Sequence, residues 1–379
     1  MRGLLAVALA LALAPAAHAR PWTPVQARAA LAHGVVHVED DVQADRPVFD
    51  LAVPATGGTL TRLGPSRFRY SGPARDVNRG TTLPVTVTFV RDAAGIDVTS
   101  FRGPPPDTSQ PSLPLRLAFY YGWFPEVWFD TATFPFSRYD PLRGGYYDSA
   151  DASLLSSQIA AMQYGKIGAG IWSWWGQGTP TDVRFPVALA MARQTSFRWA
   201  VYYEAEGYGD PSPAQIRSDL EYIRDNYASN PAYLRFDGRF VVFAYGGRES
   251  CSVADRWTQA AQGLGAYIVL PAFENFRDCA NQPDSWHFYS ASIPEFELHG
   301  YSFGVCPGFW RIDEPQPRLD RDVARFAQDV RDMVASHEPL QLVLTFNEWG
   351  EGTAVEDATA WQSASGYGQY LDVLHDDGG

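Results

Sequence analysis

Residues 340–353 read LQLVLTFNEWGEGT, an apolar run that changes abruptly to polar residues after Phe346. A short apolar run with this kind of boundary is typical of a strand that is buried on both faces of a parallel sheet. Polar residues directly after such a strand lie at its C-terminal end, where barrels of alternating strands and helices build their active sites. The stretch therefore predicts a buried strand that delivers Asn347, Glu348 and Glu351 to a site.

Seven similar apolar runs precede this strand, at Leu115–Tyr121, Ala169–Trp174, Trp199–Glu204, Phe240–Tyr245, Tyr267–Phe273, His287–Ser290 and Phe303–Pro307. Helical patterns lie between several of them, at Leu154–Met162, Ala214–Tyr227 and Leu319–Val334. Apolar residues in the last pattern recur at spacings of three and four, which indicates an amphipathic helix. Eight such units predict an α/β fold, a (β/α)8 TIM barrel over residues 115–379. The fifth and sixth connections carry no convincing helix pattern.

The region before the barrel has a different composition. Residues 104–114 read PPPDTSQPSLP, which predicts a stiff, extended linker. Residues 20–103 contain short β-like runs between turn residues, at Val48–Val53, Phe68–Ser71, Leu83–Val90 and Ile96–Phe101. They predict a small all-β module, which a short helix at Arg28 to His33 opens. Because no catalytic motif occurs there, we favour a module that packs beside the barrel over a sugar-binding module.

The first 19 residues have the features of a secretory signal peptide. Arg2 gives a positive start, Leu4 to Ala14 form an apolar run, and Ala17-His18-Ala19 matches a cleavage site. The apolar run is shorter than a membrane-spanning helix needs, and no later segment is long and apolar enough. We expect a secreted, periplasmic or cell-surface protein without a membrane span; an uncleaved anchor is the alternative.

Composition narrows the class of partner. The chain has 43 acidic and 30 basic residues, a net charge of −13, which excludes a polyanion such as nucleic acid as its partner. Hydrophobic residues make up 46% and charged residues 19%, so the chain is able to bury a core. The aromatic share of 14% suits a surface that stacks on sugar rings.

Three cysteines and no C-x-x-C motif argue against a zinc ribbon or a thioredoxin-like site. Three pairings are possible. Cys251 and Cys279 follow the fourth and fifth predicted strands and belong to neighbouring loops, so we predict a disulfide between them. Cys306 lies inside the seventh strand and is predicted to be a buried free thiol.

Aromatic and carboxylate side chains gather at the ends of the predicted strands: Tyr120–Trp123, Ser173–Gly176, Tyr202–Glu206, Tyr245, Glu274–Asn275, Pro307–Trp310 and Asn347–Thr353. Glu348 and Glu351 stand three residues apart among them. Glycosidic bond cleavage typically uses two carboxyl groups, one of which protonates the leaving oxygen. Two nearby carboxylates repel, which raises the pKa of one of them and keeps an acid available near neutral pH. The pair therefore indicates a glycoside hydrolase with Glu348 and Glu351 as its catalytic groups.

Residues 345–356, TFNEWGEGTAVE, resemble the signature F-N-E-W-H-E-G-T-x-I-E of glycoside hydrolase family 99, the endo-α-mannosidases. Other segments are similar to motifs of that family in the same order. YYGWF at 120–124 resembles Y-Y-P-W-Y, GYYDS at 145–149 resembles G-x-Y-x-S, and SWW at 173–175 resembles S-W-Y. YYE at 202–204 stands at the place of H-I-E, and PGF at 307–309 at that of G-P-G-Y. The resemblance spans about residues 115–375.

The resemblance implies a (β/α)8 barrel that cleaves inside α-mannosidic chains with retention of configuration. Glu348 would take the proton of the sugar's own 2-hydroxyl, which attacks the anomeric carbon and gives an epoxide-like intermediate. Glu351 would protonate the leaving sugar and then activate water. The residues that would bind the substrate are Tyr121, Trp174, Glu204, Tyr245, Asn347 and Trp349. We predict no cofactor and no metal.

The chain departs from the family pattern at several positions beside the site. Gly350 replaces a His between the two acids, Gly122 replaces a Pro, and Tyr202 and Tyr203 replace His and Ile. These changes keep the acid pair but alter its surroundings. We therefore expect a divergent member of the family, and the sequence does not fix which sugar it binds.

Other readings of the sequence stay open as alternatives. An α-glucanase or another endo-acting polysaccharide hydrolase would use the same acid pair, and a non-catalytic surface carbohydrate-binding protein would use the same aromatic residues. Gly300–Gly304 matches G-x-S-x-G, the nucleophile motif of α/β-hydrolases, but Pro307 and Gly308 follow where that motif needs a helix. No H-E-x-x-H occurs. A divalent ion held by scattered carboxylates remains an alternative, and we expect activity to survive chelation.

Overall fold

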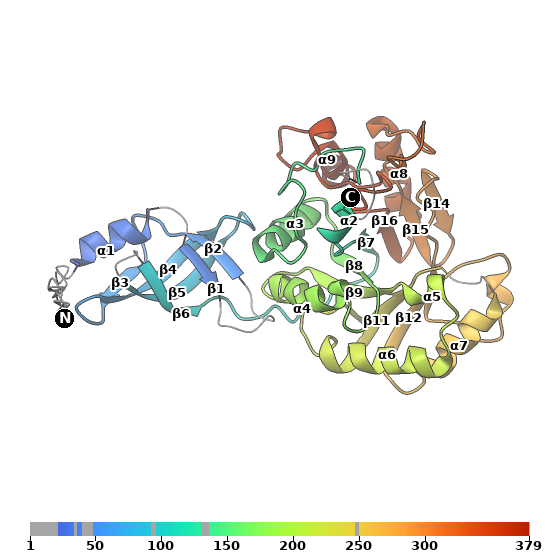
Figure 1. The fold of residues 1–379 in the computed structure, drawn as a ribbon, viewed down its shortest axis with the longest axis horizontal. Helices are drawn as coiled ribbons and strands as arrows, with labels where there is room; N and C mark the ends of the chain where they lie inside the picture. The colour runs from blue at the N-terminus through green and yellow to red at the C-terminus, as the bar shows by residue number, and fades with distance from the viewer. Residues whose placement is uncertain are drawn as a thin grey trace, which may run out of the picture.

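The computed structural model describes residues 22–33, 36–39, 48–91, 96–129, 136–246 and 250–378. The predicted signal peptide, residues 1–19, lies outside the described residues. The described chain forms two sheets, one of six strands and one of ten, and Figure 1 shows them side by side along the long axis of the molecule. No helix in this described part is long and apolar enough to cross a membrane.

The six-stranded sheet is antiparallel and follows a short helix, α1 (Pro24–Leu31). Its strands are β1 (Val36–Glu39), β2 (Val48–Ala52), β3 (Thr59–Arg62), β4 (Arg67–Asp76), β5 (Thr82–Arg91) and β6 (Ile96–Arg102). Buried and exposed side chains alternate at the start of β4, so one face of the sheet is apolar. Phe68 and Tyr70 on this face join Leu31 of α1 in a small core of its own. The predicted strands of this region overlap β2, β4, β5 and β6.

Eight parallel strands form the barrel-like sheet: β7 (Leu115–Tyr120), β8 (Ala169–Trp174), β9 (Arg198–Tyr203), β11 (Arg239–Ala244), β12 (Ala266–Pro271), β13 (Ser285–His287), β15 (Ser302–Val305) and β16 (Leu340–Val343). The hydrogen-bonded order is β13-β12-β11-β9-β8-β7-β16-β15. All eight coincide with predicted strands to within a few residues. Two further strands pair antiparallel at the margins, β10 (Arg235–Phe236) with β11 and β14 (Glu295–Leu298) with β15.

Helices connect the strands around the outside of this sheet (Figure 1). They are α2 (Glu126–Phe129), α3 (Ala152–Tyr164), α4 (Pro180–Ala192), α5 (Ala205–Tyr208), α6 (Pro213–Asn226), α7 (Cys251–Ala261), α8 (Val323–Ser336) and α9 (Gln369–Asp376). Capping side chains set several starts: the Asp322 carboxylate accepts from the Ala324 and Arg325 N–H groups. Helix α8 therefore begins four residues after the apolar periodicity, which started at Leu319.

The fifth and sixth connections depart from the strand–helix alternation, as the missing helix patterns indicated. A single 3₁₀ turn, η1 (Phe276–Asp278), lies between β12 and β13. Strand β14 lies between β13 and β15 and pairs with β15 as a hairpin, from Glu295 opposite Val305 to Leu298 opposite Ser302. A second 3₁₀ turn, η2 (Thr359–Trp361), precedes α9.

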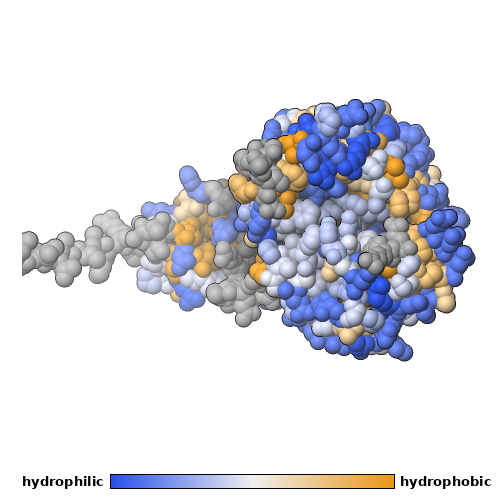
Figure 2. Space-filling view, turned by 45° about the vertical axis from the view of Figure 1, so that its right-hand side comes forward, coloured by the Kyte–Doolittle hydropathy of each residue, from blue (hydrophilic) through white to orange (hydrophobic). Residues whose placement is uncertain are grey.

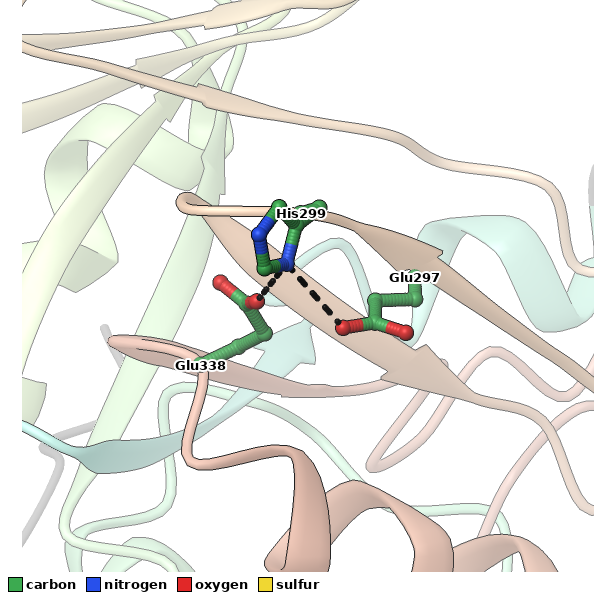
Figure 3. A group of neighbouring side chains, drawn as sticks. All are labelled: Glu297, His299 and Glu338. Atoms are coloured by element: carbon green, nitrogen blue, oxygen red, sulfur yellow. Dashed lines mark ion pairs between the residues drawn. The ribbon is translucent and has the colours of Figure 1, made fainter.

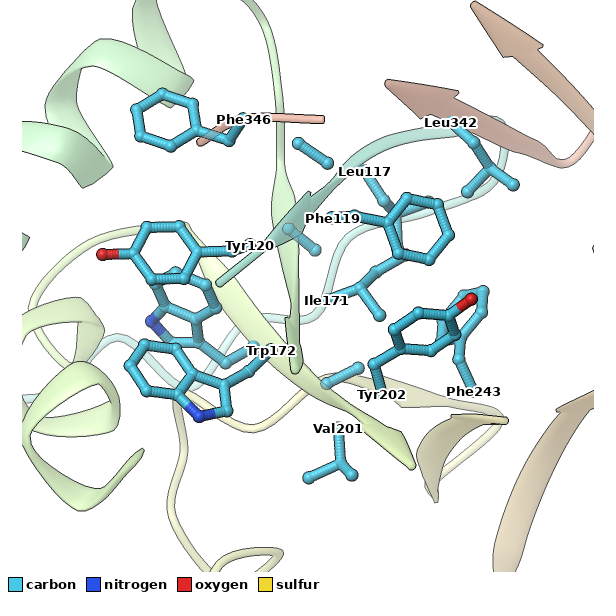
Figure 4. Close-up of a cluster of buried hydrophobic side chains, with 14 of the residues drawn as sticks. Leu117, Phe119, Tyr120, Ile171, Trp172, Val201, Tyr202, Phe243, Leu342 and Phe346 are labelled. Atoms are coloured by element: carbon cyan, nitrogen blue, oxygen red, sulfur yellow. The ribbon is translucent and has the colours of Figure 1, made fainter. Parts of the chain in front are cut away.

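Aromatic side chains fill both sides of the barrel strands (Figure 4). Inside the sheet, Phe119 of β7 contacts Tyr202 of β9 with ring centroids 4.8 Å apart. On the helix side, Tyr120 stacks on Trp172 at 5.1 Å. Because consecutive strand residues point to opposite faces, neighbouring aromatics serve two different cores. Burial of each such side chain contributes roughly 1.5–3 kcal/mol.

Residues 104–114 run extended along the barrel and are held there by hydrogen bonds. The buried Arg198 guanidinium donates to the Ser109 carbonyl (Nε to O, 2.8 Å) and to the Asp107 carbonyl (Nη2 to O, 3.0 Å). The Gln110 side chain donates to the Tyr233 carbonyl at 3.2 Å. In this structure the linker is therefore held against the barrel by hydrogen bonds.

The predicted disulfide is confirmed. Cys251, the first residue of α7, is bonded to Cys279, which follows η1. Cys306 is a buried free thiol, as predicted. The bridge joins the start of α7, in the connection after β11, to the end of η1, in the connection after β12 that has only a 3₁₀ turn.

Candidate active site

The chain after β16 folds back on itself and presents two carboxyl groups at the end of the strand. Phe346 N–H donates to the Phe119 carbonyl (2.8 Å), which continues the contact with β7, and Thr345 N–H donates to the Thr353 carbonyl (3.1 Å). Thr345 Oγ1 accepts from the Glu348 N–H at 2.8 Å. Gly352 makes the turn at φ +64°, where an added Cβ would lie 2.7 Å from the Trp310 carbonyl. Glycine is required there.

Glu348 and Glu351 lie against each other in this turn. The Glu351 N–H donates to Glu348 Oε1 at 3.2 Å, and the Glu348 side chain is only 5% exposed. Burial raises the pKa of Glu348 well above its usual range, and the negative charge of Glu351 raises it further. Burial also raises the pKa of Glu351, although the Arg311 and Arg318 guanidinium groups oppose this. The pair therefore holds protons at higher pH than ordinary glutamates do.

A third carboxyl group, Glu204, lies at the end of β9 and is 3% exposed. Burial raises the pKa of Glu204 to about 8, with a smaller contribution from the charge of Glu351. Ser173 Oγ donates to Glu204 Oε1 at 2.7 Å, which favours the ionised form and limits the rise. Trp175 Nε1 in turn donates to Ser173 Oγ at 3.0 Å. Near neutral pH, Glu204 is largely a neutral acid that presents a hydroxyl donor.

Tyrosines from several strand ends surround these acids. The Tyr121 hydroxyl donates to the Tyr289 hydroxyl at 2.9 Å, and the Tyr202 ring lies 5.7 Å from the Tyr245 ring. The buried Tyr202 hydroxyl has no hydrogen-bond partner among the described residues. In Figure 2, pale residues of intermediate hydropathy, the range of Tyr and Trp, gather in a hollow in the middle of the barrel domain with hydrophilic residues around them.

Trp174 does not line the mouth of the barrel, so this prediction is wrong. Its ring is fully buried on the helix side, and its Nε1 donates to Asp182 Oδ1 at 2.7 Å. The reason is strand alternation, because Ser173 already points inward. Trp175, which follows the end of β8, is 37% exposed, and its ring lies 4.8 Å from the ring of Tyr208. Trp175 occupies the place that was predicted for Trp174.

Asn347 and Trp349 are also buried behind the mouth instead of lining it. Asn347 Oδ1 accepts from the Tyr121 N–H at 2.7 Å and its Nδ2 donates to the Tyr121 carbonyl at 2.9 Å. This two-way contact joins the ends of β16 and β7. Trp349 Nε1 donates to the Tyr147 hydroxyl at 3.1 Å. The predicted lining role is wrong for both side chains; they position the loop that carries Glu348 and Glu351.

Of the residues predicted to bind substrate, the structure brings Tyr121, Glu204 and Tyr245 to the neighbourhood of the acid pair. The charge of Glu204 contributes to the pKa of both tyrosines. Sequence reasoning missed Tyr289 and Tyr208. Tyr289 lies two residues after β13, near the end of the predicted strand His287–Ser290, and this position was a usable signal. Tyr208 belongs to α5, and no motif marks it.

Similarity to characterised proteins agrees with this geometry. No protein-family model matches the sequence. Glycoprotein endo-alpha-1,2-mannosidase of Rattus norvegicus is 25% identical over 362 residues, 73% of this chain and 76% of that protein. The Xenopus laevis protein of the same name is 21% identical over 339 residues, 69% of this chain and 74% of that protein.

Among solved structures, the GH99 endo-alpha-mannosidase from Bacteroides thetaiotaomicron has a similar fold. Its complex with bis-tris-propane superposes with a TM-score of 0.56 at 17% identity, over 69% of this chain and 95% of that chain. The fold is thus a (β/α)8 TIM barrel. Together with this fold, the relatives found by sequence identify the chain as a glycoside hydrolase. Within that class, these similarities support a divergent member of family 99.

Proposed function

We propose that this protein is an exported, retaining glycoside hydrolase that cleaves α-mannosidic or similar bonds in a polysaccharide or glycan. The observation that carries the proposal is the buried contact between Glu348 and Glu351, 3.2 Å from N–H to Oε1, at the end of β16. Burial of both groups, together with the charge of Glu351 beside Glu348, provides what such a reaction needs, a proton donor near neutral pH beside a group that accepts a proton. We infer a mannosidic substrate because the similar proteins are named endo-alpha-mannosidases.

In the proposed reaction, Glu348 in its ionised form takes the proton of the sugar 2-hydroxyl; the raised pKa of Glu348 makes this carboxylate a stronger base than an ordinary glutamate. The oxygen that is freed attacks the anomeric carbon, the bond to the leaving sugar breaks, and protonated Glu351 gives its proton to the departing oxygen. In the second half, Glu351 takes a proton from water, the water oxygen attacks the same carbon, the bond between that carbon and the 2-oxygen breaks, and the 2-oxygen recovers its proton from Glu348. Two inversions give net retention, and both carboxyl groups return to their first state.

Glu204 and the tyrosines fit the role of substrate contacts in this proposal. A neutral Glu204, with a pKa of about 8, is able to donate a hydrogen bond to a sugar hydroxyl. Tyr121 and Tyr245 offer further hydroxyl groups beside it. Trp175 and Tyr208 give an exposed aromatic surface for the flat face of a sugar ring.

We further propose that residues 1–19 are a signal peptide, that residues 20–103 form a flanking module, and that residues 115–379 are the catalytic domain. A separate small core around Phe68 and Tyr70 supports the module, and the strapped linker 104–114 supports a fixed placement beside the barrel. Secretion, or transfer to the periplasm or cell surface, rests on the sequence of the first 19 residues, and the disulfide agrees with it.

One feature favours a second candidate, an α-glucanase or another endo-acting polysaccharide hydrolase. Gly350 stands where the family signature has a His, and an added Cβ at this position would lie 2.6 Å from the Phe136 ring. The room for a polar side chain beside the acid pair is therefore taken by an aromatic ring. Replacement of the His by Gly350 changes which hydroxyl groups of a sugar are able to form hydrogen bonds with the protein.

The test is a screen of mannans, α-glucans and other microbial polysaccharides, with product masses as the readout. We expect oligosaccharides from an α-mannan and none from the double variant Glu348→Gln/Glu351→Gln. Products from an α-glucan alone would favour the second candidate. Binding to mannan with no product after long incubation would overturn the hydrolase proposal and leave a carbohydrate-binding protein.

A further inference from the structure

A second group of titratable side chains lies at the opposite end of the barrel from the acid pair. Glu297 belongs to β14, His299 lies in the turn between β14 and β15, and Glu338 lies two residues before β16 (Figure 3). The group is therefore at the N-terminal ends of β15 and β16. Glu348 lies beyond the C-terminal end of β16, so this cluster is not part of the site described above.

The three side chains present their polar atoms to one another. His299 Nδ1 lies 3.2 Å from Glu338 Oε1 and 3.6 Å from Glu297 Oε1. One ligand atom from each residue lies within 4.8 Å of the other two. Tetrahedral Zn²⁺ with bonds of about 2.0–2.2 Å places its ligand atoms about 3.3–3.5 Å apart. The observed spacing needs only a small side-chain adjustment to meet that geometry.

The burial of Glu338 is a second observation, independent of the distances between the three side chains, that points to a bound ion. Its side chain is only 4% exposed, and its Oε2 is buried without a hydrogen-bond partner. Within the described ranges, neither Glu338 nor Glu297 forms an ion pair with any Lys or Arg. A buried carboxylate without such compensation is costly, and buried charges are normally paired or coordinate metals.

Hydrogen bonds of the main chain hold the three ligand positions in place. The Glu338 N–H donates to Ser336 Oγ at 3.2 Å, and the Leu340 N–H donates to the Tyr301 carbonyl at 3.2 Å. Arg277 Nη2 donates to the His299 carbonyl at 2.6 Å, so that the guanidinium is engaged with the main chain. A ligand set on a fixed backbone loses little freedom when it binds.

We propose that Glu297, His299 and Glu338 bind one Zn²⁺ ion, with water in the fourth position. One imidazole nitrogen and two carboxylates suit zinc, whereas Ca²⁺ and Mg²⁺ prefer oxygen ligands alone. The ion would tie the β14–β15 hairpin to the start of β16, in the connection where the hairpin replaces a barrel helix. The ion would take no part in the reaction at the acid pair, because that pair lies at the other end of the strand.

The experiment titrates the full-length, tag-free, chelator-treated protein with Zn²⁺ in a calorimeter and measures the melting temperature in parallel. We expect one ion per chain and a melting temperature that rises with Zn²⁺. His299→Ala and Glu338→Gln should weaken binding by more than the roughly 10–100-fold that loss of an outer partner causes. Hydrolysis per folded molecule, measured where activity is found, should not change with Zn²⁺.

Two controls keep the proposal falsifiable. Glu297→Gln changes an exposed side chain and should weaken Zn²⁺ binding without loss of the fold, which circular dichroism checks. His337→Asn removes a neighbouring imidazole while it keeps a residue that tolerates the left-handed backbone there (φ +57°), and it should bind Zn²⁺ as the wild type does. No binding by the wild type, equal binding by His299→Ala, or tighter binding of Ca²⁺ than of Zn²⁺ would overturn the proposal.

Discussion

At the scale of single residues, three carboxyl groups at the end of the barrel are held away from water. The pKa of Glu204 is raised to about 8, and those of Glu348 and Glu351 are raised as well, mainly because they are buried. A protein that buries several acids gives up stability when they ionise. That arrangement is understandable where proton transfer is the purpose, and it makes the site visible in the pH dependence of folding.

Glu204 should make the protein less stable as pH rises. Its folded pKa of about 8 lies above the ordinary value of 4.5, so the folded state keeps a proton that the unfolded state releases. The stability lost between about pH 4.5 and 8 is on the order of 4 kcal/mol. Glu204→Gln removes this loss. The melting temperature of this variant, minus that of the wild type, should therefore increase as pH increases. A difference that is constant from pH 5 to 8 would contradict the burial argument.

The two adjacent tryptophans should respond differently to substitution. Trp174→Ala empties a buried site and removes the bond to Asp182, so it should destabilise the fold by about 3–5 kcal/mol. Trp175→Ala should leave the melting temperature nearly unchanged and weaken binding of oligosaccharides, which calorimetry measures. A larger loss of stability in Trp175→Ala would contradict the register described here.

At the scale of elements, strands were the most predictable part of the molecule. Mostly apolar runs such as Leu340–Phe346 are a direct consequence of burial on both faces, so all eight barrel strands were visible in the sequence. The β14 hairpin was missed because its residues, Glu295 to Leu298, alternate between polar and apolar in only four positions. Positions of side chains behind the site were equally hidden: Asn347 is fixed by Tyr121, which is 226 residues away in the chain.

The disulfide between Cys251 and Cys279 can be checked by counting thiols. The purified protein, denatured without reductant, should show one free thiol, that of Cys306. Because the bridge closes a separation of 28 residues, its reduction should lower the free energy of unfolding by about 3–4 kcal/mol in the chain-entropy model. Three free thiols in protein exported to an oxidising compartment would contradict the bridge.

At the scale of the whole molecule, the barrel and the six-stranded sheet have separate cores but share contacts. Ser153 of α3 donates to Asp50 of β2 at 2.6 Å, and Arg79 donates to the Met191 carbonyl at 3.0 Å. The linker is strapped to the barrel by Arg198. The family resemblance and the acid pair were readable from the sequence because both lie in one continuous stretch, 345–356. The aromatic wall was not, since it draws on strand ends throughout the barrel.

Hydrolysis rates of Glu348→Gln and Glu351→Gln, at equal concentrations of folded protein, test the central claim most directly. Neither substitution should destabilise the fold at neutral pH, because each removes a carboxyl group whose pKa burial raises. Each should lower the rate on an α-mannan by about 10²–10⁴-fold, the usual worth of general acid–base catalysis. On a substrate with a good leaving group, Glu351→Gln should recover part of its rate and Glu348→Gln should not. Near-normal hydrolysis by either folded variant would contradict the assignment of this pair.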